Sequence, residues 1–252
     1  MDFTGKTVLV TGGSRGIGRH VALQFAERGA RVAINYRTNR AAAEATLAEL
    51  AGSGHITVQA DCADPEAVKR MVETAVSTFN RLDILVNNAG IFESHPLADV
   101  SYEEWQAKWH SILNTNLIGA ANASYCAGQQ MIKQGGGRII NVSSRGAFRG
   151  EPLCPAYGAS KAGMNAMSQS LAKYLAPYNV FVGVVAPGFV ETDMAEEILR
   201  GPLGDELRNQ SPLGRVAKPE EVAYGVLFLA SEGAEFMTGA ILDVNGASYL
   251  RT

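Results

Sequence analysis

Short apolar runs alternate with longer amphipathic stretches along almost the whole chain. The apolar runs are rich in Val and Ile and have no polar face, as in "TVLV" from Thr7 and "VFVGVV" from Val180. Strands of this kind are typical of a parallel sheet with both faces covered by helices. The alternation therefore predicts an α/β fold in which helices connect successive strands.

Seven such runs are separated by predicted helices. The predicted strands cover residues 7–12, 31–36, 56–61, 82–88, 137–144, 180–187 and 240–246. The predicted helices cover residues 16–28, 39–51, 65–79, 101–134, 156–176 and 219–230. One long connection, residues 188–218, looks like broken helix, and we expect it to cover the substrate. No linker or repeat interrupts the pattern, so we predict a single domain over residues 1–252. Its fold class is a Rossmann-type, doubly wound, seven-stranded parallel sheet with helices on both faces.

Composition and charge exclude several classes of partner. The 22 Lys and Arg residues stand against 25 Asp and Glu, and the net charge of -3 gives no general attraction to nucleic acid or to an anionic membrane. No apolar run reaches the ~18 residues of a membrane span. The start of the chain, with Asp2 and one short apolar run, is unlike a signal peptide. We expect a cytoplasmic protein.

Cysteine and histidine spacing indicates neither disulfides nor a metal site. The cysteines are odd in number and far apart: Cys62, Cys126 and Cys154. The histidines show no metal-ligand spacing: His20, His55, His95 and His110. We therefore expect buried or idle thiols and histidines that are hydrogen-bonded or on the surface, with no metal.

The first predicted strand runs into "TGGSRGIG", a turn that contains Gly12, Gly16 and Gly18. Glycine permits positive φ and a close approach of phosphates, and the N–H groups at a helix start attract anions. The spacing differs from the commoner G-x-G-x-x-G, and no Gly-Lys-Ser/Thr follows as in a P-loop. The turn predicts a dinucleotide site, and a tight corner with nothing bound is the alternative.

The end of the second predicted strand bears on the choice of dinucleotide. NAD sites usually have an acid there, whereas this chain has Asn35, Tyr36 and Arg37. Together with Arg15 in the glycine turn, Arg37 could hold a 2′-phosphate through paired hydrogen bonds. This favours NADP(H) over NAD(H), and two solvated surface arginines are the alternative.

Tyr157 and Lys161 in "YGASK" are four residues apart and share one face of a predicted helix. A reaction that moves hydride to a carbonyl also needs a proton for the developing alkoxide, and a phenol of lowered pKa can supply it. We expect the Lys161 ammonium to lower the pKa of Tyr157. A core tyrosine without a catalytic role is the alternative.

Ser144 stands at the end of the fifth predicted strand. Ligands of open parallel sheets bind at the carboxyl ends of the strands, where this hydroxyl could hydrogen-bond a substrate oxygen. Alone, Ser144 could equally be a polar strand end or a helix N-cap. Beside Tyr157 and Lys161, it favours catalysis.

Six motifs resemble, in their order from Lys6 to Gly246, the single-domain short-chain dehydrogenase/reductase family: "TGGSRGIG", "NNAG", "TNLIG", "NVSS", "YGASK" and "PGFVETDM". The resemblance implies a catalytic set of Asn116, Ser144, Tyr157 and Lys161. Tyr157 would be the general acid/base, and Ser144 would hold the substrate oxygen. Lys161 would bind the ribose and lower the pKa of the phenol. Asn116 would hold a water that links Lys161 to solvent.

The resemblance also implies the residues that bind the dinucleotide. They are Gly12, Ser14, Arg15, Gly16, Ile17, Gly18, Tyr36, Arg37, Asp61, Asn88, Ala89, Gly90, Tyr157, Lys161, Pro187, Gly188, Val190 and Thr192. Asp61 would meet the adenine amino group, and residues 88–90 would line the adenosine ribose. Residues 187–192 would position the nicotinamide.

Within the family, "INYR" resembles the NADPH-preferring branch, and "GAILDVNGA" is similar to 3-oxoacyl-[acyl-carrier-protein] reductases. Glu151, Leu153 and Cys154 would border the substrate, and an acid there departs from what an acyl thioester needs. The alternatives are an NAD-linked sugar or polyol dehydrogenase and a non-catalytic dinucleotide-binding regulator. The resemblance further implies a homotetramer packed through the long helix that ends near Gln134 and the helix of Tyr157.

Overall fold

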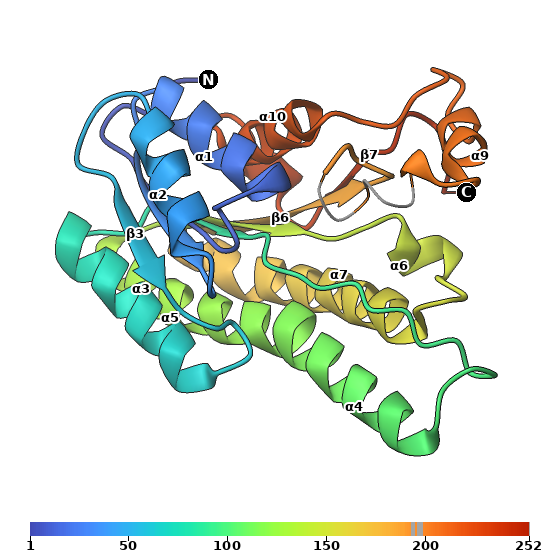
Figure 1. Cartoon of the computed structure of the whole chain (residues 1–252). Coiled ribbons are helices and arrows are strands. Elements are labelled where there is room, and N and C mark those ends of the chain that lie inside the picture. The colour runs from blue at the N-terminus through green and yellow to red at the C-terminus, as the bar shows by residue number, and fades with distance from the viewer. Residues whose placement is uncertain (193–194, 196–198, 252) are drawn as a thin grey trace.

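The computed structural model describes residues 1–192, 195 and 199–251, and its centre is a seven-stranded sheet (Figure 1). The strands are β1 (Thr7–Val10), β2 (Arg31–Tyr36), β3 (Ile56–Gln59), β4 (Ile84–Asn87), β5 (Gly137–Val142), β6 (Val180–Pro187) and β7 (Ile241–Val244). They lie in the order β3-β2-β1-β4-β5-β6-β7, and each neighbouring pair is parallel. The predicted seven-stranded parallel sheet is confirmed. The order reverses between β1 and β4, and such a switch point forms a ligand crevice at the carboxyl ends of the strands.

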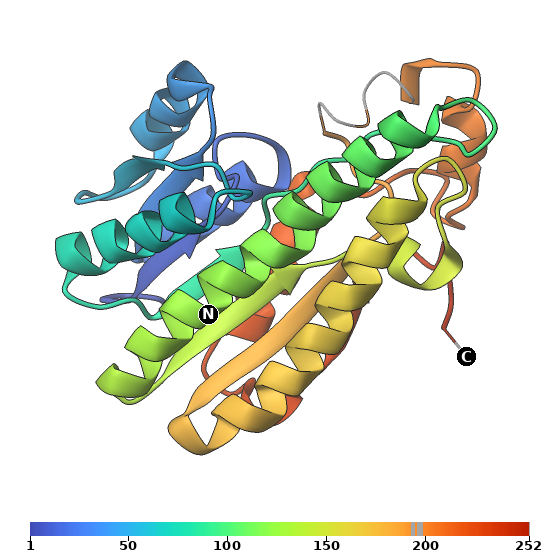
Figure 2. The ribbon, with the colours of Figure 1, turned by 90° about the horizontal axis from the view of Figure 1, so that it is seen from below.

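Helices cover both faces of the sheet. They are α1 (Gly16–Glu27), α2 (Arg40–Glu49), α3 (Pro65–Phe79), α4 (Tyr102–Leu113), α5 (Gly119–Gln134), α6 (Gly146–Arg149), α7 (Pro155–Leu175), α9 (Gly204–Asn209) and α10 (Pro219–Ala230). Figure 1 shows α1 and α10 on one face and α3, α5 and α7 on the other. In the view from below, α7 runs beside the long rod that α4 and α5 form (Figure 2).

Strand side chains alternate between the two faces, and each face has its own core. Val8 and Val10 of β1 pack with Phe25 of α1 and Val226 of α10, whereas Leu9 packs into the core under α3, α5 and α7. Because both faces are buried, the strands need apolar residues at successive positions. This explains the unbroken apolar runs in the sequence.

Two α-helices joined by a π-helical turn, η1 (Asn114–Ile118), make up the predicted helical region 101–134. Ser101 starts α4 with a capping box in which its side chain accepts from the Glu104 N–H. π-Helical turns often occur at functional sites because they re-aim side chains within a continuous helix. The turn contains Asn116, a predicted catalytic residue.

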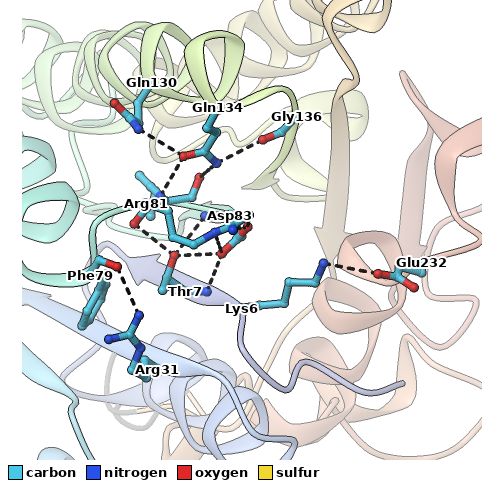
Figure 3. Close-up of polar contacts among 11 residues, drawn as sticks. Lys6, Thr7, Arg31, Phe79, Arg81, Asp83, Gln130, Gln134, Gly136 and Glu232 are labelled. Carbon is cyan, nitrogen blue, oxygen red and sulfur yellow. Dashed lines mark hydrogen bonds and ion pairs between the residues drawn. The ribbon is translucent and has the colours of Figure 1, made fainter.

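A polar network closes the amino end of the sheet, opposite the expected ligand edge (Figure 3). The buried carboxylate of Asp83 accepts from the Thr7 N–H at 2.8 Å and from the Arg81 Nε at 2.9 Å. Gln134 donates to the Leu82 carbonyl at 2.7 Å and accepts from the Leu82 N–H at 3.1 Å. These bonds join the starts of β1 and β4 to the end of α5, and they hold the scaffold without taking part in the site.

The long connection 188–218 is only partly regular. It contains α9 and a parallel bridge between Val190 and Ala217, whereas residues 193–194 and 196–198 lie outside the described part. The prediction of broken helix agrees with the described residues. None of the helices described is long and apolar enough to cross a membrane.

Candidate active site

The glycine turn after β1 is shaped by two close contacts. Gly12 has φ +62°, which favours glycine. A Cβ on Gly18 would clash with the Gly12 carbonyl oxygen and lie only 2.5 Å from the Asn88 Nδ2, so only glycine lets α1 start this near the strand end. The absence of a side chain at Gly18 thus allows α1 to pack against the turn and against Asn88.

Side chains from β2 and from the segments after β1 and β4 hold the turn in place. The Asn88 Nδ2 donates to the carbonyls of Thr11 and Gly12 at 3.0 and 3.1 Å. The Thr11 hydroxyl accepts from the N–H groups of Asn88 and Ala89, each at 3.0 Å. The buried Asn35 accepts from the Gly12 N–H at 3.1 Å. Sequence reasoning assigned no role to Thr11 and treated Asn35 only as the missing acid. A polar residue that ends an apolar strand was the available signal for both.

A cavity of about 550 Å³ opens at the carboxyl edge of the sheet. The predicted cofactor and catalytic residues line this cavity, except Gly18 and Asn116, which lie behind its wall. Its volume falls within the ~300–1,000 Å³ of small-molecule sites. No group of three or more His, Cys, Asp or Glu side chains in the described chain could hold a metal ion.

Arg15 and Arg37, the two arginines predicted to favour NADP(H) over NAD(H), both line this cavity. Arg15 is the N-cap of α1 and gives the helix no side-chain cap, so first-turn N–H groups are left for a ligand. The exposed guanidinium groups of Arg15 and Arg37 form neither hydrogen bonds nor ion pairs with any described residue. These two cations and the start of a helix thus line the same cavity. This arrangement fits a phosphorylated dinucleotide.

Tyr157 and Lys161 lie on α7, and their side chains face the same cavity as Ser144. The Lys161 Nζ lies 5.7 Å from the centre of the Tyr157 ring and donates to the Val142 carbonyl at 2.8 Å. The Ser144 hydroxyl accepts from the Gly146 N–H at 3.0 Å and is near enough to the phenol to lower the pKa of Tyr157. The predicted trio is therefore assembled at one point of the cavity wall.

The pKa of Tyr157 moves upward, opposite to the lowering expected from Lys161, and Lys161 is not among the causes of this shift. Burial raises the pKa of Tyr157 to about 12, although the Ser144 hydrogen bond lowers it, and the charge of Glu151 raises it further. Burial also lowers the pKa of Lys161 to about 8. Loss of water disfavours the charged form of each group, the phenolate of Tyr157 and the ammonium of Lys161.

Asn116 lies behind the cavity wall and is fully buried in η1. Its Oδ1 accepts from the Ile91 N–H at 2.8 Å, and its Nδ2 donates to the Ile91 carbonyl at 3.0 Å and to the Ser160 hydroxyl at 3.2 Å. A Cβ on Gly90 would lie 3.4 Å from the Asn116 Oδ1 and 3.5 Å from the Lys161 Nζ. Position 90 therefore lies in van der Waals range of both the amide and the ammonium.

Sequence comparison identifies the family to which this site belongs. A family model described as "Enoyl-(Acyl carrier protein) reductase" matches residues 12–247. The 3-oxoacyl-[acyl-carrier-protein] reductase FabG of Staphylococcus aureus (strain N315) is 41% identical over 247 residues, which are 97% of this chain and 98% of that relative. The chain belongs to the short-chain dehydrogenase/reductase family. The protein is therefore an oxidoreductase, as predicted.

Solved structures of short-chain dehydrogenase/reductase proteins agree with the fold. A dehydrogenase/reductase from Sinorhizobium meliloti 1021 has a TM-score of 0.91 and 33% identity, covering 99% of this chain and 97% of that chain. A short chain dehydrogenase from Burkholderia cenocepacia J2315, solved in complex with NADP, has a TM-score of 0.89 and 35% identity, covering 98% of this chain and 99% of that chain.

In this short-chain dehydrogenase/reductase, Glu151 forms part of the cavity wall near Tyr157. Its half-buried carboxylate makes neither a hydrogen bond nor an ion pair with a described residue, and burial raises its pKa against the pull of Arg149 and Arg145. Cys154 lies deeper and donates through its Sγ to the Glu93 carbonyl at 3.1 Å. Of the three residues predicted to border the substrate, Glu151 lines the cavity, whereas Leu153 and Cys154 do not.

Buried Arg145 links this wall to the long connection and the end of the chain. Its guanidinium donates to the Gln210 Oε1 and to the Ser248 hydroxyl, each at 2.6 Å, and stacks over the Phe189 ring at 4.9 Å. Burial lowers the pKa of Arg145 to about 10. The sequence offered no signal for this link, because the partners lie far along the chain.

Proposed function

We propose that this protein is an NADP(H)-dependent oxidoreductase that reduces a ketone to a secondary alcohol, with Tyr157 as general acid/base. The observation that carries the proposal is that Ser144, Tyr157 and Lys161 line the same cavity as the glycine turn and as Arg15 and Arg37, which are free of described partners. The Burkholderia cenocepacia relative, solved in complex with NADP, supports the choice of dinucleotide.

The residues around the glycine turn would hold the dinucleotide. First-turn N–H groups of α1 would bind its pyrophosphate, and Arg15 and Arg37 would bind the 2′-phosphate. Asp61 and residues 88–90 would lie along the adenosine, and residues 187–192 along the nicotinamide. Bound NADPH would supply the hydride.

The chain itself would supply the proton. With a pKa near 12, the Tyr157 phenol is protonated at neutral pH and can donate to the alkoxide that develops on the substrate. The Ser144 hydroxyl would hold the substrate oxygen beside the phenol. The Lys161 ammonium, 5.7 Å from the ring centre, would stabilise the phenolate left after proton transfer. Asn116 would hold a water that returns a proton through Lys161.

Two substrate classes have separate support. The name of the Staphylococcus aureus relative supports a 3-oxoacyl thioester, and we take this as the first candidate. The carboxylate of Glu151, which has no described partner, favours a hydroxylated ketone of the sugar or polyol type, because carboxylates accept hydrogen bonds from hydroxyl groups. A preference for hydroxylated ketones over acetoacetyl thioesters would support the second class, ketones of the sugar or polyol type.

A ketone panel with both nicotinamide cofactors tests the proposal. Acetoacetyl-CoA, hydroxylated ketones and aromatic ketones are each incubated with NADPH or NADH, and loss of cofactor absorbance is followed. We expect reduction of at least one ketone with a clear preference for NADPH. A clear preference for NADH would favour the alternative of an NAD-linked dehydrogenase. Absence of turnover on the whole panel would favour the non-catalytic regulator.

We also propose a homotetramer and a cytoplasmic location. Exposed tyrosines on the two helices expected at the interfaces, Tyr125 on α5 and Tyr174 on α7, support the assembly. Light scattering on the purified protein measures the mass directly, and a monomeric mass would reject the tetramer.

A further inference from the structure

His95 is fully buried in the segment between β4 and α4, outside the wall of the large cavity. Its Nδ1 lies 2.7 Å from the Glu93 carbonyl oxygen, and its Nε2 accepts from the Ala156 N–H at 3.3 Å. A carbonyl oxygen can only accept, so Nδ1 carries the hydrogen and Nε2 presents its lone pair. The ring thus has one defined orientation, which its edge-to-face contact with Trp105 reinforces.

The bond to Ala156 replaces a missing helix cap. Cys154 is the N-cap residue of α7, and its side chain makes no capping hydrogen bond. Pro155 has no N–H, so Ala156 carries the first helical N–H that needs an acceptor. His95 supplies this acceptor from 61 residues earlier in the chain. The next residue along the helix is Tyr157.

Further contacts fasten the same two segments together. The His95 N–H donates to the Leu153 carbonyl at 2.8 Å, and the Cys154 Sγ donates to the Glu93 carbonyl at 3.1 Å. Glu93 is in turn ion-paired with Lys108 of α4 at 2.9 Å. The start of α7 is therefore held by a segment that begins at the cavity wall, with His95 as its central side chain.

We propose that His95 is a positioning residue for catalysis, which sets the place of the Tyr157 phenol by capping the first turn of α7. The inference rests on the proposed role of Tyr157 as general acid/base. Loss of the Nε2 acceptor leaves a buried N–H unpaired, and the first turn shifts or frays to find another partner. Proton transfer from Tyr157 is sensitive to such a shift, because small errors in the position of a reacting group slow the reaction strongly.

Two substitutions separate positioning from simple stability. His95→Phe keeps a ring against Trp105 but has no acceptor, whereas His95→Gln places an amide oxygen near the position of Nε2. At a temperature where every variant is folded, we expect His95→Phe to lower kcat for the best ketone by about 10- to 100-fold. The Kd for NADPH should stay within about 2-fold, because the glycine turn is untouched. His95→Gln should recover most of kcat.

His55 provides a matched control. Its Nδ1 accepts from the Val32 N–H at 3.1 Å, and its Nε2 lies 3.0 Å from the Ala51 carbonyl oxygen. The same type of bond is made there, at the amino end of β2 and away from the cavity. His55→Phe should therefore lower stability without lowering kcat.

Hydrogen exchange of the Ala156 amide tests the bond to His95 independently of turnover. In the parent protein the Ala156 amide should be protected, and in His95→Phe it should exchange at least about 10-fold faster, with protection restored in His95→Gln. A rapidly exchanging Ala156 amide in the parent, or equal kcat in folded His95→Phe and parent, would overturn the proposal. So would a His95→Gln variant as slow as His95→Phe. If the parent reduces no ketone, the proposed function fails, while the exchange result still decides whether the cap exists.

Discussion

The Lys161 ammonium lies 5.7 Å from the centre of the Tyr157 ring, and burial shifts the pKa of each group against its charged form. The phenol becomes a weaker acid and the ammonium a stronger one. A phenol that stays protonated suits donation to an alkoxide, which is the proton transfer of ketone reduction.

Ketone reduction should depend on the protonation of Lys161. Since burial lowers the pKa of Lys161 to about 8, its charge is present below that pH and lost above it. We expect kcat/KM for reduction to fall as pH rises through about 8, because this parameter follows the ionisation of the free enzyme. A profile that stays level well above this pH would show that the charge of Lys161 is not needed.

Replacing Lys161 by Met should stabilise the fold while abolishing turnover. The pKa of this lysine falls from 10.5 to about 8, so below pH 8 the folded protein bears the cost of a buried ammonium. The methionine removes this cost, and we expect the free energy of unfolding to rise by about 1–3 kcal/mol at neutral pH.

The size of the stabilisation by Lys161→Met should depend on pH. Between pH 8 and 10.5 the unfolded chain binds more protons at Lys161 than the folded protein, so the stability of the parent rises with pH. The advantage of Lys161→Met should therefore shrink over this range in urea unfolding. Lys173→Met, at an exposed position on the same helix, is the control and should show no such advantage. A destabilised Lys161→Met at neutral pH would contradict the account.

Glu151 should tune the phenol through its charge. The charge of Glu151 raises the pKa of Tyr157, secondary to burial, so Glu151→Gln should lower that pKa. In the direction of alcohol oxidation, Tyr157 must be deprotonated to accept a proton, so kcat should rise with pH, and in Glu151→Gln this rising limb should move to lower pH. Glu103→Gln, at an exposed position on α4, should leave the profile in place. If the pH profile of kcat in Glu151→Gln matches that of the parent, the charge of Glu151 does not affect the pKa of Tyr157.

The fold and most site positions were predictable because they depend on local pattern. Strands buried on both faces require apolar residues such as Val8 and Leu9 in succession, and this identified the strands and the parallel sheet. The glycine turn and Ser144 were found because ligands of such sheets gather at the carboxyl ends of the strands. Their side chains do line the cavity.

Packing decided what the sequence could not predict. Spacing placed Lys161 beside Tyr157, but the direction of the pKa shift depends on how much water the folded wall excludes. The bond between His95 and Ala156 joins residues 61 positions apart, and no local pattern indicates it. The π-helical turn around Asn116 was missed because its residues also suit an α-helix.

Arg37 should select NADPH over NADH. Its guanidinium is free of described partners and lines the cavity, so Arg37→Ala should weaken NADPH binding by about 10- to 100-fold, the value of one charge-assisted contact. Affinity for NADH, which lacks the 2′-phosphate, should change by no more than about 2-fold. Arg40→Ala is the control, because Arg40 is exposed and paired with Glu44. Equal losses for both cofactors in calorimetric titrations would reject a phosphate contact.

The most direct test of the account is turnover of the Tyr157→Phe variant alongside its NADPH affinity. The variant keeps the ring that packs at 5.1 Å against Phe92 and removes only the hydroxyl. We expect NADPH binding within about 2-fold of the parent and a fall in kcat for the best ketone of about 10²- to 10⁴-fold, the range for a general acid. Parent-like turnover with parent-like NADPH binding would contradict the assignment of Tyr157 as the proton donor.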